Sequence, residues 1–356
     1  SGNITAGTNI EAIKWNSEQG TITAGADITV TGDWYSKRSN ISGINITSSG
    51  SKWTSWGRIT ATGNIDIENE LAFTGGYITV GGNLAAKKLN AYSNAYSGGL
   101  IVFNGSGTRK LSGNGGNNIE GGSIQNLQIN SGTILELESD IIITVGLDNQ
   151  GVFDAVINSK KVRLVHAAGL PTPPDPPDNI TIKNTSAANT KFHDLECTNA
   201  GGKALTINGK ITVAGNLDIS GTPPNNLLNI AGEGEITLVS DQTAAPSSPP
   251  QKGYYLNIHT NIPITDGHTY TVRESKAEQV SGFSISAGNP KNWIFLNCID
   301  KLTWNGSQST DWGNDGSTNS YKNWTPWGIP GEETEVEIPQ LTTTSPKYPK
   351  LESSTN

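Results

Sequence analysis

The string with the most chemical potential is FHDLEC, which runs from Phe192 to Cys197 and holds one of the four histidines of the chain. A histidine, two carboxylates and a thiol in such proximity could bind a metal ion or serve in acid–base catalysis. On a β-strand, however, adjacent side chains point to opposite faces. His193 and Leu195 would then share one face and Asp194 and Glu196 the other, so that His193 and Asp194 would not share a metal. We therefore expect an ordinary strand here.

A second candidate lies at Asp311, Asn314, Asp315 and Gly316, which faintly resemble a calcium-binding loop. Such a loop needs a ligand at its third position and a bidentate glutamate at its twelfth. Gly313 and Lys322 occupy these two positions. The match fails, and we expect no metal site.

Paired carboxylates offer a third kind of chemistry, because some β-helical proteins cleave polysaccharides with acidic and basic residues grouped across several coils. Here the acidic residues are scattered, as in Glu136 and Glu138 or Glu233 and Glu235, and no Asp-Asp or Arg-x-x-Lys group is present. Solvated charges that prevent sheet-to-sheet aggregation account for them. We expect no catalytic residues and no cofactor.

Four of the nine tryptophans form the remaining candidate site: Trp304, Trp312, Trp324 and Trp327. Exposed indoles could bind a glycan by stacking on its sugar rings. Alternatively, the four side chains could form the core of a small module that has few other large apolar residues. Both interpretations, ligand binding and packing, stay open at this point.

The elements that position these residues are repeats. Trp15, Trp34 and Trp53 are each 19 residues apart, and Phe73 follows one residue late. We expect the three indoles to occupy equivalent positions on successive coils, stacked internally or at a corner, with ring centroids roughly 4.5 to 7 Å apart.

A second series keeps step with the first, because similar strings begin at Ile4, Ile22, Ile41, Ile59 and Ile78, spaced 18, 19, 18 and 19 residues apart. A period near 20 with many β-branched residues predicts an all-β solenoid, a parallel β-helix of about 18 to 20 residues per coil. The string ITVAGNLDI, from Ile211, repeats the pattern later in the chain.

Stacked coils would also place the Gly-Asn and Gly-Asp corners above one another. A ladder of corner residues is then expected, interrupted in its amide hydrogen bonding by the aspartate. Its members are Asn9, Asp27, Asn45, Asn64 and Asn83.

Composition agrees with a solenoid. Glycine accounts for 42 of 356 residues, while hydrophobic residues make up only 34%, which suits thin cores and many turns. The net charge of −8 argues against a nucleic-acid partner, whose phosphates require a basic face. No apolar run reaches the roughly 18 residues of a membrane-spanning helix. Cys197 and Cys298 are about five coils apart, roughly 24 Å at the usual strand spacing, so we expect both to be buried and not bonded to each other.

Two stretches resemble a known family. The pattern W-x-G-x-x-S-x-D-W, followed by N-W, G-x-P-G and Ile-Pro, extends from Trp304 to Pro339, and β-helical strings such as VFNGSGTRKLSG precede it. Together they resemble the large, repetitive, filamentous-haemagglutinin-like surface proteins of diderm bacteria. The resemblance implies a right-handed parallel β-helix, a location on the cell exterior and a role in adhesion or surface architecture. It supplies no catalytic residues.

We expect four segments: a regular β-helix over 1–170, its continuation with proline-rich loops over 171–300, a Trp-rich β-module over 301–339 and an extended tail over 340–356. The predicted function is a non-catalytic structural or adhesive segment of a large extracellular bacterial surface protein. The alternatives are a polysaccharide lyase or hydrolase on the same fold, or a glycan-binding module on a stalk. Host or matrix glycans or proteins are the expected external partners.

The N-terminal residues predict self-association. Ser1 is not a translation start, because the chain contains no methionine, and Ile4 is already in register with the repeats. An uncovered end coil exposes unpaired backbone groups. We therefore expect that coil to contact a second copy, or an upstream segment of the same polypeptide, and to form an end-to-end array.

Overall fold

The computed structural model describes residues 2–92, 99–113, 123–165, 179–185, 190–197, 203–221, 227–243, 255–259, 262–273, 275–278, 292–298, 302–305, 324–325, 328–330 and 334–339. These residues form strands, turns and bends with no helix, and the parallel coils build the predicted β-solenoid, with about 21 residues per turn. The chain divides into two compact units, Ser1–Glu196 and Cys197–Asn356.

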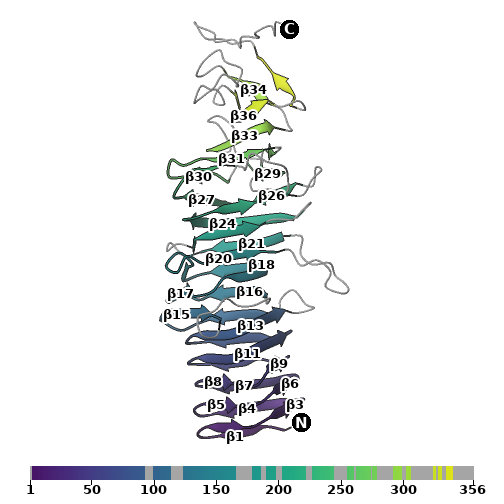
Figure 1. Cartoon of the computed structure of the whole chain (residues 1–356), viewed down its shortest axis with the longest axis vertical. Helices are drawn as coiled ribbons and strands as arrows, with labels where there is room; N and C mark the ends of the chain where they lie inside the picture. The colour runs from purple at the N-terminus through teal and green to yellow at the C-terminus, as the bar shows by residue number, and fades with distance from the viewer. Residues whose placement is uncertain are drawn as a thin grey trace. The chain divides into compact units, whose positions relative to one another are not determined.

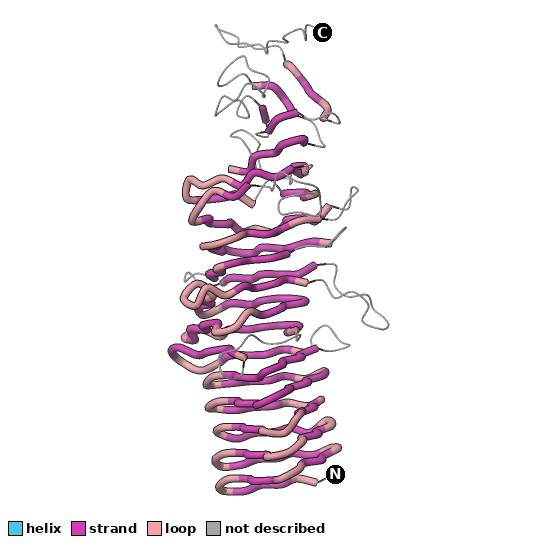
Figure 2. Tube along the Cα trace, in the orientation of Figure 1, coloured by secondary structure: helices cyan, strands magenta, loops and turns pink. Residues whose placement is uncertain are grey.

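The first unit winds through three parallel faces in each coil, and short corners separate the faces (Figures 1 and 2). Face 1 consists of β1 (Ile4–Ala6), β4 (Gly20–Ala24), β7 (Ser39–Gly43), β10 (Ile59–Ala61), β12 (Tyr77–Val80), β14 (Leu100–Phe103), β16 (Ile124–Ile129), the second half of β18 (Ile141–Asn149) and β21 (Asn179–Asn184).

Face 2 consists of β2 (Ile10–Ala12), β5 (Ile28–Val30), β8 (Ile46–Ser48), the first halves of β11 (Ile65–Thr74) and β13 (Leu84–Tyr92), β15 (Gly107–Ser112), β17 (Thr133–Leu137), β19 (Val152–Asp154) and β22 (Thr190–Phe192). Face 3 consists of β3 (Trp15–Ser17), β6 (Trp34–Ser36), β9 (Lys52–Ser55), the second halves of β11 and β13, the start of β18, β20 (Lys161–Leu164) and β23 (Asp194–Cys197).

Coil registry in this unit follows the repeats read from the sequence. Ile22 lies between Ile4 and Ile41, and Ile59 lies between Ile41 and Ile78. Apart from the exposed Ile4, these isoleucines are at most 2% exposed. In each strand, the residue that follows the isoleucine points outward and is at least partly exposed. The period-2 alternation of each short strand therefore produces a thin apolar core inside the coils.

The tryptophans stack as predicted. Trp34 pairs in register with Trp15 on one side and with Trp53 on the other. The ring centroids of Trp15 and Trp34 are 6.0 Å apart. Those of Trp34 and Trp53 are 4.1 Å apart, slightly closer than expected, and these two rings are nearly parallel. Phe73 does not continue the stack, because Trp53 pairs with Leu71 and Phe73 pairs with Ser55.

The corner ladder is also present, but the expected interruption at Asp27 is wrong. Each side-chain Oδ1 accepts a hydrogen bond from the backbone N–H of the corner residue one coil along, so a carboxylate serves as well as an amide. Asp27 Oδ1 in fact accepts two hydrogen bonds, from the backbone and the side chain of Asn45. The donor–acceptor distances are 3.2 Å for Asn9 and Asp27, 3.1 and 2.9 Å for Asp27 and Asn45, 2.9 Å for Asn45 and Asn64, and 2.8 Å for Asn64 and Asn83.

A second corner uses the same device. Oδ1 of Asp33 accepts hydrogen bonds from the N–H groups of Ser51 and Lys52, at 3.0 and 3.3 Å, and from the Ser51 hydroxyl at 2.6 Å. The Ser51 hydroxyl, and then the backbone donors, lower the pKa of Asp33 below its ordinary value of 3.8. Side-chain oxygens thus continue the axial hydrogen bonding through corners where strand pairing stops.

The second unit repeats this plan with longer coils. Its described solenoid strands are β24 (Ala204–Val213), β25 (Leu217–Ile219), β26 (Leu228–Ala231), β27 (Gly234–Leu238), β28 (Gln242–Thr243), β29 (Leu256–His259), β30 (Ile264–Thr265), β31 (Tyr270–Arg273), β32 (Lys276–Glu278), β33 (Trp293–Cys298) and β36 (Gly328–Pro330). The parallel columns β24–β26–β29–β32, β24–β27–β30 and β28–β31–β33–β36 again give three faces.

The described part of the Trp-rich module is divided between two sheets, because β36 pairs with β33 in the solenoid column and the other three strands form a small separate sheet. The small sheet consists of β34 (Leu302–Trp304), which pairs antiparallel with β35 (Trp324–Thr325) and parallel with β37 (Val336–Glu337). The calcium-loop candidate and residues 340–356 lie outside the described residues, as do the proline-rich stretches except for their ends at Asn179 and Thr243. Cys197 is buried, while the side chain of Cys298 is not described, so the absence of a bond between them stays a prediction.

The indole stack yields the first prediction. Substitution of Trp34, which is 1% exposed between two other indoles, by alanine should lower the free energy of unfolding by about 3–5 kcal/mol, because it leaves a large cavity in a thin core. Denaturant titration of the whole chain measures the change. Trp56, which is 41% exposed, is the matched control, and Trp56→Ala should cost only about 0.5 kcal/mol. Equal losses in the two variants would contradict the role of the stack.

The corner ladder yields the second. Asn64→Ala removes the acceptor of the exposed Asn83 N–H and should cost about 0.5–1.5 kcal/mol in the same titration, because water can replace the lost acceptor. Asn64→Asp is the control and should retain most of the stability, because the carboxylate of Asp27 already accepts the equivalent backbone hydrogen bond. If the aspartate variant is as unstable as the alanine variant, the ladder does not work through Oδ1 acceptance.

Acid sensitivity gives the third. Because the folded-state pKa of Asp33 is lowered, its ionisation stabilises the fold above the ordinary pKa of 3.8, and this contribution is lost as the pH falls through the lower, folded-state pKa. Asp33→Asn keeps the Oδ1 acceptor without the titration. Thermal melts between about pH 5 and pH 2 should therefore show a smaller loss of melting temperature in the variant than in the original chain; parallel curves would refute the prediction.

Candidate functional site

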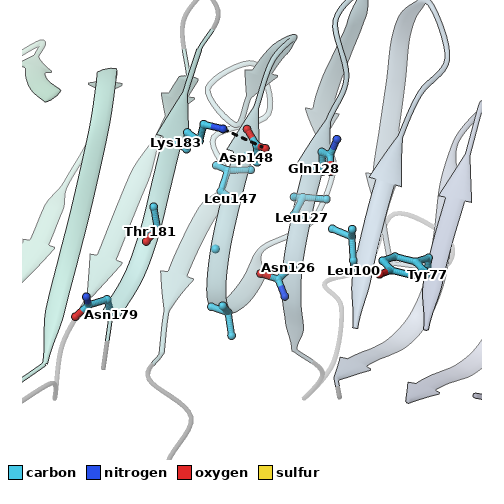
Figure 3. Close-up of a pocket in the computed structure, with 12 residues that line it drawn as sticks. Tyr77, Leu100, Asn126, Leu127, Gln128, Leu147, Asp148, Asn179, Thr181 and Lys183 are labelled. Carbon is cyan, nitrogen blue, oxygen red and sulfur yellow. Dashed lines mark ion pairs between the residues drawn. The ribbon is translucent and has the colours of Figure 1, made fainter. Parts of the chain in front are cut away.

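A groove of about 670 Å³ lies on the outside of face 1 in the described part of the first unit, and Figure 3 shows its lining residues. It crosses five successive coils, from β12 through β14, β16 and β18 to β21. The lining residues are Tyr77, Leu100, Asn126, Leu127, Gln128, Val145, Gly146, Leu147, Asp148, Asn179, Thr181 and Lys183.

Strand registry arranges the outward residues of the groove in two columns. The first column contains one residue from each of five successive coils: Tyr77, Leu100, Asn126, Gly146 and Thr181. The second column contains Gln128, Asp148 and Lys183. Since neighbouring strands lie about 4.8 Å apart, the four coil steps from Tyr77 to Thr181 span about 19 Å along the solenoid.

The groove is hollow at Gly146 because this residue places no side chain between Asn126 and Thr181. A Cβ added to Gly146 would lie 3.2 Å from the Thr181 carbonyl oxygen and 3.6 Å from Asn126 Oδ1. The floor beneath is apolar, since Leu127 and Leu147 are only 1% and 2% exposed. The sequence thus combines a buried aliphatic floor with a polar outer lining.

The polar lining is held by local contacts. The ammonium group of Lys183 lies 3.8 Å from Asp148 Oδ2, and Gln150 donates a hydrogen bond to the same oxygen at 3.3 Å. Gln128 donates from Nε2 to Asn130 Oδ1 at 2.8 Å. These contacts orient the second column of side chains along the groove.

The Arg58 guanidinium lies beside the Tyr77 end of the groove, 5.7 Å from the centre of the Tyr77 ring. A second exposed aromatic ring, Trp56, also has a cation over it, since the Lys37 ammonium lies 5.4 Å from its centre. Tyr77 is 39% exposed and Trp56 is 41% exposed. Among the ion pairs of the described residues, none involves Arg58 or Lys37.

The groove lining contains one carboxyl group. Glycoside hydrolysis ordinarily requires two carboxyl groups on either side of the scissile bond. The groove lining supplies one, Asp148, and it is already paired with Lys183. Within the part of the chain that the structure describes, no group of three or more metal-ligating side chains is found.

The histidine string occupies the end of the first unit, where the structure corrects the strand prediction in part. His193 lies at a bend between β22 and β23, rather than on the face of a strand with Leu195. Its Nδ1 is therefore only 3.3 Å from Asp194 Oδ1. Leu195 is buried, and Asp194 and Glu196 are partly exposed, as expected.

The scattered acidic residues are in several cases paired across coils. Glu138 contacts Lys110 and raises the pKa of that ammonium group, and Glu235 lies 3.2 Å from Lys210. Glu196 accepts from both Lys161 and Arg163. Such pairs fit solvated charges on the outer faces.

Two of the four predicted site tryptophans are described. Trp304 and Trp324 are fully buried and pack edge to face, with ring centroids 5.0 Å apart and an interplanar angle of 81°. These two indoles belong to the core of the small sheet. Trp312 and Trp327 lie outside the described residues, so a ligand-binding role for the set stays a prediction.

The groove was not predicted from the sequence. Two signals pointed to it: a glycine, Gly146, within the apolar strand string IIITVGLDN, and an aromatic residue, Tyr77, at an outward position directly before a repeat isoleucine. Their alignment depends on the coil registry after residue 92, where the spacing of repeats drifts.

Comparison with known proteins adds no relative. No protein-family model matches the chain, and neither a curated protein nor a solved structure matches it. Among the described residues, no helix is long and apolar enough to cross a membrane.

Proposed function

We propose that this chain is a non-catalytic structural and adhesive segment of a large extracellular bacterial surface protein. The observation that carries the proposal is the in-register stacking of the face 1 strands from β1 to β14, where inward positions are devoted to packing and corner side chains to axial hydrogen bonds. This construction holds an outer surface at fixed spacing over many coils. The filamentous-haemagglutinin-like repeats and the tryptophan pattern support the location and the role.

The groove favours this function over polysaccharide hydrolysis. It follows the solenoid and contains a single, paired carboxylate among its lining residues, whereas a hydrolase needs two carboxyl groups in a set separation. A surface of this kind holds a partner without transforming it.

The partners of the segment are further coils and external ligands. Among the described residues, β1, β2 and β3 pair only with the next coil, and Ile4 is 47% exposed. Their other edges carry N–H and C=O groups that another parallel strand can satisfy. An adjoining coil of the same long polypeptide, or a second copy of this chain, is the partner we propose for that edge.

Surface display is the fourth prediction. Antibodies raised against the whole chain should label intact source cells in immunogold microscopy, and treatment of intact cells with proteinase K should abolish the signal while a cytosolic marker protein persists. Labelling that appears only after permeabilisation would overturn the proposed location.

A further inference from the structure

The groove on face 1 and the Arg58 guanidinium at its Tyr77 end form one outward strip. Tyr77 belongs to both parts, because it begins the groove and lies under the Arg58 guanidinium. We propose that this strip binds an extended acidic glycan, with Tyr77 packed against a sugar ring and Arg58 paired with a sugar carboxylate.

The shape of the groove suits a linear chain. Its outward columns run along the solenoid for about 19 Å, with one set of side chains every 4.8 Å or so. The missing side chain at Gly146 leaves room midway along this path, between Asn126 and Thr181. Several sugar rings in a row fit a surface of this length and periodicity.

The chemistry of the lining suits sugars. An exposed aromatic ring offers an apolar face to the C–H groups of a pyranose, and amide groups can both donate to and accept from hydroxyl groups. Tyr77 supplies the ring, and Asn126, Gln128 and Asn179 supply the amides. An extended peptide is a poorer occupant, because it binds by adding to a free sheet edge, and the central strands of this groove already have a paired strand on each side.

The charges of the strip favour an acidic sugar at the Tyr77 end. At the opposite end, Lys183 is balanced by Asp148. Arg58 takes part in none of the ion pairs of the described residues, and it presents a planar donor group that matches a carboxylate. The net charge of −8 repels polyanions at long range, but screening limits that repulsion to about 8 Å at physiological salt.

This inference rests on the adhesive part of the proposed function and deepens it, because it names the ligand class and the surface that binds it. The two can also fail separately. Surface labelling of cells tests the location, whereas the experiment below uses the purified chain and depends only on the groove.

The fifth prediction is tested by isothermal titration calorimetry of the whole chain with three carboxylated hexasaccharides, made of galacturonic acid, alginate and hyaluronan, at about 0.15 M salt. Maltohexaose, which is neutral, is the matched probe for the galacturonate hexamer. At least one acidic hexamer should bind, and more tightly than maltohexaose. Tyr77→Ala and Arg58→Gln should each weaken that binding about tenfold, because each removes a direct contact with the ligand.

Tyr35→Ala is the control variant, because Tyr35 is exposed to nearly the same degree, 38% against 39%, but lies on face 3. Its affinity should equal that of the original chain. Gly146→Ser, whose Cβ would lie 3.2 Å from the Thr181 carbonyl oxygen in the middle of the path, should weaken binding, and its melting temperature is measured alongside to separate a blocked path from a weakened fold. The proposal is overturned if no acidic hexamer binds, if maltohexaose binds as tightly, or if Tyr77→Ala and Arg58→Gln bind as well as Tyr35→Ala.

Discussion

Parallel, in-register hydrogen bonding between successive coils is the constraint on which the rest of this structure depends. Each residue of a coil contacts the equivalent residue of the next coil, one strand spacing away. The residue type at one position therefore restricts which residue types fit at the same position in the two neighbouring coils. Isoleucine contacts isoleucine, indole contacts indole, and a corner side chain meets the N–H of the next corner. Repetition in the sequence follows from this geometry.

That constraint explains why much of the first unit could be predicted from the sequence. The 19-residue interval of Trp15, Trp34 and Trp53 survives because an indole out of register would disturb two coils at once. The prediction for Asp27 was wrong for a local reason. It assumed that the corners bond through side-chain amides, whereas the acceptor is Oδ1 and the main donor is the backbone, so Asn and Asp are equivalent there.

The groove and the bend at His193 could not be predicted in the same way. Both depend on how the coils are aligned after the regular repeats end. Gly146, for example, pairs with Thr181 although 35 residues separate them. The sequence does not reveal which residues of a lengthened coil form strands and which form loops outside the stacked strands. At His193, period-2 alternation holds only while the chain remains a strand. The corner between β22 and β23 breaks that alternation and brings Nδ1 next to its neighbour's carboxylate.

Inward and outward positions therefore respond differently to change. An inward substitution alters the packing of three coils in a core that is only one side chain deep, as at Trp34. An outward substitution within a strand leaves the backbone hydrogen bonds between coils intact, and its effect on stability is small. Face 1 could thus exchange the small hydroxyl side chains of its early coils, such as Thr23, Ser42, Thr60 and Thr79, for the larger and charged ones of its later coils at little cost in stability. Val102, Gln128, Asp148 and Lys183 continue the same column. The solenoid separates the residues that keep the coils stacked from those that can contact a partner, and a binding strip can arise on it wherever successive outward residues change together.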